Sequence, residues 1–250
     1  MIGRDQILIG LSPTCLRVGT LSGGKVGKVT CTPLEPGEWE QAWDQELKPF
    51  DAKLTAALTD MGIGKGSRAR VVYFSQRATA EVFSLPVKGG AAFQAAQFSL
   101  TESLPSRDEV WPTSLTTLAS DKSSATAPKT HVLGVADSAT ATEVLAAWVE
   151  RAGLKAGELI PAKAAALAQA VRVARTLPAS GTHALLWVDD HATVLAGWSD
   201  GRLIFARSLD FGYWMLAEAM MRGCRMGERR GIPQQLAYSI LFSEIGRAHV

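Results

Sequence analysis

The chain has few cysteines and histidines, almost no net charge and no long apolar run. Its 250 residues include 3 Cys and 4 His, and 26 Lys plus Arg stand against 24 Asp plus Glu. Three scattered cysteines without a CxxC pair exclude a disulfide framework, argue against a structural zinc site and suit a reducing cytoplasm. A formal net charge of +2 gives no electrostatic basis for binding nucleic acid or an anionic membrane.

Membrane segments and the common catalytic motifs are missing as well. No apolar run approaches the roughly 20 residues that a membrane span needs, and Met1–Gln6 lacks the apolar region of a secretory signal. There is no G-x-S-x-G elbow and no H-E-x-x-H pair, and Gly62–Ser67 (GIGKGS) lacks the spacing of a P-loop. We therefore expect a cytoplasmic globular protein, and we assign no catalytic residue and no metal ligand.

What the sequence does contain is a pair of similar strand patterns. The first set of strands is predicted at 7–11, 15–21 and 26–32, and the second at 184–188, 193–198 and 203–208. In each set a polar break follows the first strand, and a glycine turn separates the last two; Asp200-Gly201 is typical of a type I′ hairpin turn. The similarity predicts two domains that begin with the same unit, with a chance likeness of two meanders as the alternative.

The rest of the chain alternates helices and strands, which is typical of an α/β protein. Helices are predicted at 39–61 with a break near Pro49, and at 91–104, 139–152, 163–177 and from 213 onward. Strands are predicted at 69–75, 80–85 and 131–137, with a short extended piece at 159–161. The stretch 118–130 is rich in Ser, Thr, Ala and Lys and is interpreted as an exposed connection.

Four segments, in this order, resemble the actin-like nucleotide-binding fold of the pilus-assembly protein PilM and of the cytoplasmic part of the type II secretion protein GspL. They are ILIGLSPTCLRV, FSLPVKGGAAFQAAQFSLTESLPSRDEV, VLGVADSATATEVLAAWVERAGLKAGELIPAKAAALAQAV and LLWVDDHATVLAGWSDGRLIFARSLDFG. The resemblance implies actin-like (ribonuclease H-like) mixed sheets flanked by helices, with a small inserted α+β subdomain.

The resemblance also implies a division of the chain. Residues 1–68 and 131–182 are expected to form the first domain, 69–130 the inserted subdomain, and 183–244 the start of a truncated second domain. The last six residues, 245–250 (IGRAHV), would be encoded by ATC-GGA-AGA-GCA-CAC-GTC, a string that looks like a sequencing-library adapter. We therefore expect these six residues to be an artefact, and the gene to be cut short near Glu244.

In the family, two hairpin loops hold ATP with magnesium, usually through an Asp and a Gly in each loop. The positions here that match these loops are Ser12, Thr14, Cys15, Asp189, His191 and Thr193. The first loop has neither Asp nor Gly, and Pro13 removes a backbone donor. The second loop keeps Asp189 but has no Gly, and its adjacent carboxylates repel phosphate. We therefore expect a degenerate nucleotide site, with retained ATP and magnesium binding as the alternative; His191 is interpreted as a polar loop tip rather than as a base or ligand.

The resemblance implies a binding function rather than catalysis. In the family, the inserted subdomain helps to form a groove for the N-terminal cytoplasmic tail of the membrane protein PilN, which places Leu85, Phe93 and Phe98 as partner-binding candidates. The implied protein is a scaffold at the cytoplasmic face of the inner membrane, held there through its partners, with the motor ATPase of the assembly as a second candidate partner. The alternatives are an active ATPase or kinase of the same fold, and an unrelated αβ domain that shares only the meanders.

Overall fold

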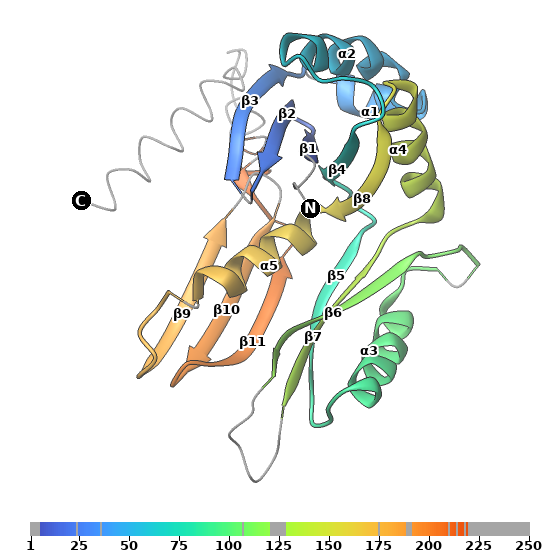
Figure 1. Ribbon diagram of the computed structural model, residues 1–250. Coiled ribbons are helices and arrows are strands. Elements are labelled where there is room, and N and C mark those ends of the chain that lie inside the picture. The colour runs from blue at the N-terminus through green and yellow to red at the C-terminus, as the bar shows by residue number, and fades with distance from the viewer. Residues whose placement is uncertain are drawn as a thin grey trace, which may run out of the picture. The chain divides into compact units, whose positions relative to one another are not determined.

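The computed structural model describes residues 6–23, 25–35, 37–106, 108–120, 129–174, 176–188, 192–209, 211–213, 215–217 and 219. The chain divides into two compact units (Figure 1). Unit 1 comprises Met1–Ala80, Phe93–Thr116 and Leu133–Ala165, and unit 2 comprises Glu81–Ala92, Thr117–Val132 and Ala166–Val250. In the parts of the chain just given, no helix is both long and apolar enough to cross a membrane.

Unit 1 is built on a five-stranded mixed sheet in the order β3-β2-β1-β4-β8. Its strands are β1 (Gln6–Ser12), β2 (Cys15–Ser22), β3 (Lys25–Pro33), β4 (Arg68–Tyr73) and β8 (Lys155–Pro161). The first three form an antiparallel meander, while β1, β4 and β8 run parallel to one another. The predicted first meander is therefore confirmed, and the parallel strands extend it on one side.

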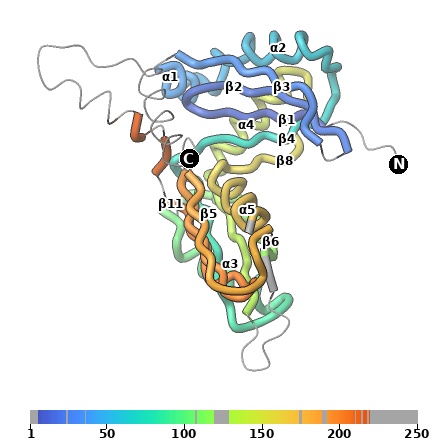
Figure 2. Tube along the Cα trace, turned by 90° about the vertical axis from the view of Figure 1, so that its left-hand side faces the viewer, coloured from blue at the N-terminus to red at the C-terminus, as the bar shows by residue number. Residues whose placement is uncertain are grey.

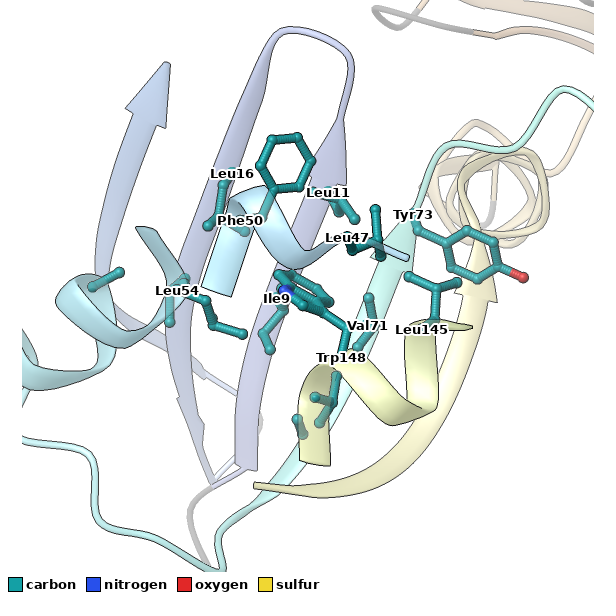
Figure 3. Packing of buried hydrophobic residues seen from close by; sticks show 14 of the residues in the cluster. Ile9, Leu11, Leu16, Leu47, Phe50, Leu54, Val71, Tyr73, Leu145 and Trp148 are labelled. Atoms are coloured by element: carbon teal, nitrogen blue, oxygen red, sulfur yellow. The ribbon is translucent and has the colours of Figure 1, made fainter. Parts of the chain in front are cut away.

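Helices cover one face of this sheet. They are α1 (Glu38–Asp44), the 3-10 helix η1 (Lys48–Phe50), α2 (Asp51–Asp60) and α4 (Ala139–Arg151). The face is made by alternate residues of the strands, because successive side chains of a strand point to opposite sides. Ile9, Val71 and Trp148 are fully buried at the centre of the cluster (Figure 3). Full burial of a side chain of this size contributes about 1.5–3 kcal/mol, so this layer is the main source of stability of unit 1.

Helix α4 begins and ends at residues whose chemistry sets its limits. The Ser138 hydroxyl accepts a hydrogen bond from the backbone N–H of Ala141 (3.1 Å) and caps the first turn. At the other end Gly153 has a φ of +80°, its N–H donates to the Glu150 carbonyl, and the Leu154 N–H donates to the Val149 carbonyl. This pair of bonds is a Schellman motif, which confirms the predicted helix stop at Gly153.

Arg151, the last residue of α4, holds a strained turn between α1 and α2. Glu46 and Leu47 both have left-handed φ values, 55° and 61°, which cost free energy in residues other than glycine. The Arg151 guanidinium binds both carboxylate oxygens of Asp51 (3.0 and 3.1 Å) and donates to the Glu46 carbonyl (2.8 Å). Leu47 is fully buried. The hydrogen bonds of Arg151 and the burial of Leu47 together offset the strain of this turn.

A second, three-stranded sheet has the order β5-β7-β6. Its strands are β5 (Thr79–Leu85), β6 (Thr113–Ser120) and β7 (Thr130–Ala136), and helix α3 (Gly90–Ser103) lies between β5 and β6 in the chain. The buried residues of α3 are spaced by four (Ala92, Ala96 and Leu100) and form one face of the helix. On β7, the buried His131 ring lies 2.9 Å from the Ser84 hydroxyl through Nδ1, which ties β7 to β5.

The second predicted meander, in unit 2, is also confirmed. Strands β9 (Thr182–Val188), β10 (Thr193–Ser199) and β11 (Arg202–Leu209) form an antiparallel sheet in the order β11-β10-β9. Asp200 and Gly201 both have positive φ, as the predicted type I′ turn requires. The ring of Phe205 covers Gly197 on the paired strand, where a β-carbon would lie 2.5 Å from the ring. Helix α5 (Ala162–Ala174), which belongs to unit 2 from Ala166 on, runs along this sheet in both views (Figures 1 and 2).

Two strands differ from the sequence prediction. Strand β6 occupies 113–120, so the expected exposed connection at 118–130 begins inside a strand, and β8 is seven residues long rather than the short piece at 159–161. Gly157 explains the second case. It lies at an irregularity between β4 and β8, where a β-carbon would be 2.5 Å from the Ala69 carbonyl oxygen. Gly157 interrupts the apolar pattern of β8 in the sequence, and its lack of a side chain lets the backbones of β4 and β8 approach each other.

The buried layer of unit 1 gives a stability prediction. Leu145 of α4 is fully buried, so Leu145→Ala should lower the free energy of unfolding by about 2–5 kcal/mol. The matched control is Leu186→Ala on β9, where the side chain is 63% exposed and the change should stay within about 0.5 kcal/mol. Urea unfolding followed by tryptophan fluorescence measures both. Equal losses in the two variants would contradict the assignment of the core.

Candidate functional site

The candidate site lies at the carboxyl edge of the parallel strands in unit 1. Leu11 of β1 is paired with Tyr73 of β4, and Tyr73 is paired with Pro161 of β8. The next backbone step continues the pairing, because the Phe74 N–H donates to the Leu11 carbonyl (2.9 Å). The chain leaves β1 for β2 on one side and reaches β4 on the other, and such a switch point at the carboxyl ends is where open α/β sheets bind ligands.

The first polar group at this edge is the turn between β1 and β2. The Ser12 hydroxyl lies 3.2 Å from the Thr14 hydroxyl, donates to the Cys15 carbonyl (3.2 Å) and accepts from the Cys15 backbone N–H (3.3 Å). Pro13 has no N–H, and Thr14 does not adopt a positive φ. The Ser12 hydroxyl and the Cys15 N–H therefore bond to each other within the turn.

The second group is Asp137, which follows β7 and precedes α4. Its carboxylate is buried, with Oδ2 accepting from the Tyr73 hydroxyl (2.9 Å) and Oδ1 accepting from the Ser75 hydroxyl (3.2 Å) and the Ser138 N–H (2.8 Å). Burial, and then the charge and hydrogen bond of Asp137, raise the pKa of Tyr73 well above its usual value. The Tyr73 hydroxyl therefore stays protonated and remains a donor to the carboxylate.

The third group is Lys163, in the first turn of α5 directly after β8. Its side chain is buried, and its ammonium donates to the Ala78 carbonyl (3.0 Å) in the connection between β4 and β5. A buried ammonium needs hydrogen-bond acceptors to offset its loss of water. The bond ties the start of α5 to the segment that leaves β4.

Hydroxyls, a carboxylate and an ammonium thus gather at one sheet edge, which is the kind of chemistry that holds a phosphate and a hydrated cation. Here each oxygen of Asp137 already accepts from the protein, and Lys163 donates to a carbonyl. Among the residues that the structure describes, no group of three or more His, Cys, Asp or Glu side chains could hold a metal ion. The arrangement stabilises the junction of β4, α4 and α5 through hydrogen bonds.

Comparison with known proteins identifies the fold. No protein-family model and no curated protein matches the sequence. A chain of the PilM-PilN type IV pilus biogenesis complex is similar over 96% of this chain and 69% of its own, with 14% identity and a TM-score of 0.68. A Bacteroides thetaiotaomicron protein with an actin-like ATPase fold and unknown function is similar over 92% of this chain and 80% of its own, with 12% identity and a TM-score of 0.51. The chain has the actin-like fold.

A third similarity is looser. The cytoplasmic domain of EpsL, an inner-membrane component of the Vibrio cholerae type II secretion system, matches 92% of this chain and 80% of its own, with 11% identity and a TM-score of 0.43. The fold prediction made from the sequence, an actin-like α/β protein, is confirmed by the two better matches.

The nucleotide-loop residues that the actin-like resemblance pointed to are only partly described. Ser12, Thr14 and Cys15 share the β1–β2 turn, as predicted. Thr193 is buried at the start of β10, and its hydroxyl donates to the Phe211 carbonyl (2.6 Å), so it is used within unit 2. Asp189 and His191 lie outside the described residues, as do residues 245–250. Their roles stay predictions.

The partner-binding candidates do not form one surface on α3. Phe98 is 69% exposed, whereas Phe93 is half-buried beside Ala92. Five residues apart on a helix, the two rings point about 140° away from each other. Leu85, at the end of β5, is half-buried. Phe98 is thus the candidate whose side chain is open to a partner.

Sequence reasoning did not single out Tyr73, Ser75, Asp137 or Lys163. A signal for two of them was present: Asp137-Ser138 follows a buried strand and precedes a helix, and Lys163 is a lone charge at the start of an apolar helix. The parallel order of β1, β4 and β8 was needed to bring these residues to the same edge, and the sequence pattern does not contain that order.

The Tyr73–Asp137 contact gives a second prediction. Tyr73→Phe removes a buried donor to a carboxylate and should lower the free energy of unfolding by about 1–3 kcal/mol. Asp137→Asn should cost a comparable amount, and the double variant should cost less than the sum, with a coupling of about 0.5–3 kcal/mol. Urea unfolding of the four proteins provides the cycle. Strict additivity would mean that the bond does not stabilise the junction.

Proposed function

We propose that this protein is a cytoplasmic platform of a type IV pilus or type II secretion machine, and that it works by binding partner proteins at the inner face of the membrane. The observation that carries the proposal is the likeness to the PilM-PilN complex chain over 96% of this sequence at a TM-score of 0.68. The ordered sequence motifs that resemble PilM and GspL support the same family.

The proposed partner is the N-terminal cytoplasmic tail of a PilN-like membrane protein. The inserted subdomain that would receive it carries an exposed aromatic side chain, Phe98, together with Leu85 and Phe93, which are half-buried. An exposed ring on an ordered helix is a suitable anchor for an apolar peptide, because it buries a large area on binding. The motor ATPase of the same machine is proposed as a further partner on another face.

The proposal assigns a degenerate nucleotide site to the fold. It is supported by the β1–β2 turn, where Pro13 lacks an N–H and the Ser12 hydroxyl is used by the Cys15 backbone. Backbone donors in tight turns are what bind phosphate oxygens. ATP, if bound with magnesium, would then act as a structural ligand and not as a substrate.

Titration with a partner tail tests the binding function. A synthetic peptide with the sequence of the cytoplasmic tail of a PilN-like protein from the same organism should bind with micromolar affinity in calorimetry, and Phe98→Ala should weaken binding by about tenfold or more. The matched control is Phe211→Ala, another partly exposed phenylalanine, which should leave the affinity unchanged. A scrambled tail controls for composition. No heat with the cognate tail would argue against the proposal.

A second experiment separates the scaffold from an active enzyme of the same fold. The wild-type protein should release no phosphate from ATP with magnesium above the rate of a buffer blank. Ser12→Ala and Asp189→Ala should therefore be indistinguishable from wild type in the same assay. Steady release that either substitution abolishes would instead identify an ATPase or a kinase.

A further inference from the structure

We propose that Cys15 and Cys31 are a modification site, at which a peroxide converts the two thiols into a reversible disulfide. The two residues lie on neighbouring strands, Cys15 at the start of β2 and Cys31 near the end of β3. The site is within unit 1 and does not depend on the proposed function.

The strand register puts both thiols on one face of the sheet. Arg17 of β2 is directly opposite Cys31 of β3, and Cys15 is directly opposite Pro33. Residues two apart on a strand point to the same side. Cys15, Arg17 and Cys31 therefore share the face of the sheet opposite to the helix-covered one, and the two cysteines are diagonal neighbours.

The two thiols are near enough to influence each other's ionisation. The Cys15 sulfur lies 3.5 Å from the Ser12 hydroxyl and 3.9 Å from the Thr14 hydroxyl. Burial, and then the neighbouring Cys15 thiol, raise the pKa of Cys31, while Arg17 opposes the rise. Cys15 is buried and Cys31 is exposed. Solvent thus reaches one member of a thiol pair whose other member is shielded.

Diagonal neighbours on paired strands have α-carbons about 7–8 Å apart, slightly beyond the usual span of a disulfide. Closing the bond requires a small movement of one strand. Among the strands that the structure describes, β3 is the outermost of its sheet and is hydrogen-bonded on the β2 side alone. Because of this edge position, β3 can shift without breaking hydrogen bonds to a second described strand.

The chemistry proceeds in two balanced steps. The pKa of Cys31 is raised overall, but Arg17 opposes the rise, so a fraction of the exposed Cys31 is present as thiolate. This thiolate attacks one oxygen of hydrogen peroxide; the O–O bond breaks, a sulfenic acid forms and, after proton transfer, water leaves. The Cys15 thiolate then attacks the sulfenic sulfur, the S–S bond forms and a second water leaves. Two thiols are oxidised and one peroxide is reduced to two waters. A dithiol reductant reverses the product by thiol–disulfide exchange.

The test uses the full chain with Cys224→Ser, so that Cys15 and Cys31 are the remaining thiols. The folded protein is treated with hydrogen peroxide, quenched with an alkylating reagent and analysed by peptide mass spectrometry without reduction. We expect the two thiols to disappear together, in a Cys15–Cys31 linked peptide that dithiothreitol restores to two free thiols. Circular dichroism before and after treatment checks that the fold is kept.

Two single variants complete the test. Cys15→Ser should leave a Cys31 sulfenic acid that dimedone labels, while Cys31→Ser should react far more slowly because Cys15 is buried. Three results would overturn the proposal: a linked peptide that forms only in urea, linkage only between two molecules, or direct over-oxidation of Cys31 while Cys15 stays free to alkylate.

Discussion

The buried carboxylate of Asp137 is the constraint on which the architecture of unit 1 depends. It receives hydrogen bonds from the end of β4 through Tyr73 and Ser75, and from the start of α4 through the Ser138 N–H. A buried charge is tolerated only when hydrogen bonds replace its water. The end of β4 and the start of α4 are therefore held in one arrangement, and with them the edge of the sheet where an actin-like protein would hold its ligand.

At the same edge, polar side chains are engaged within the protein. Actin-like proteins use the carboxyl ends of their strands to present donors and carboxylates to a ligand. Here Ser12, Asp137 and Lys163 bond to protein groups instead. Polar side chains at a sheet edge can bond to a ligand or to the protein itself, and the bonds just named are to the protein. For the proposed platform function, a fixed junction would present the surfaces of the protein in a constant geometry.

The fold could be predicted from local signals, and the candidate site could be predicted only in part. Alternating apolar residues, the Asp200-Gly201 turn and the stop at Gly153 are encoded within a few residues, so both meanders and α4 were predicted with nearly correct limits. Strand β6 was not predicted because it is rich in Thr and Ser, and β8 was predicted too short because Gly157 interrupts its pattern. Asp137 and Lys163 were missed since their roles depend on strand order, a non-local property.

The edge position of β3 affects whether this protein can associate with other copies of itself. It leaves a nine-residue strand at the border of the sheet, with Val26 and Val29 more than half exposed. Such a border is a template for pairing with strands of other chains, and proteins block it with lysines and irregular register. Lys25 and Lys28 provide the charges, and the register shifts opposite Gly19–Leu21. These charges and the register shift oppose pairing of β3 with a strand of another copy.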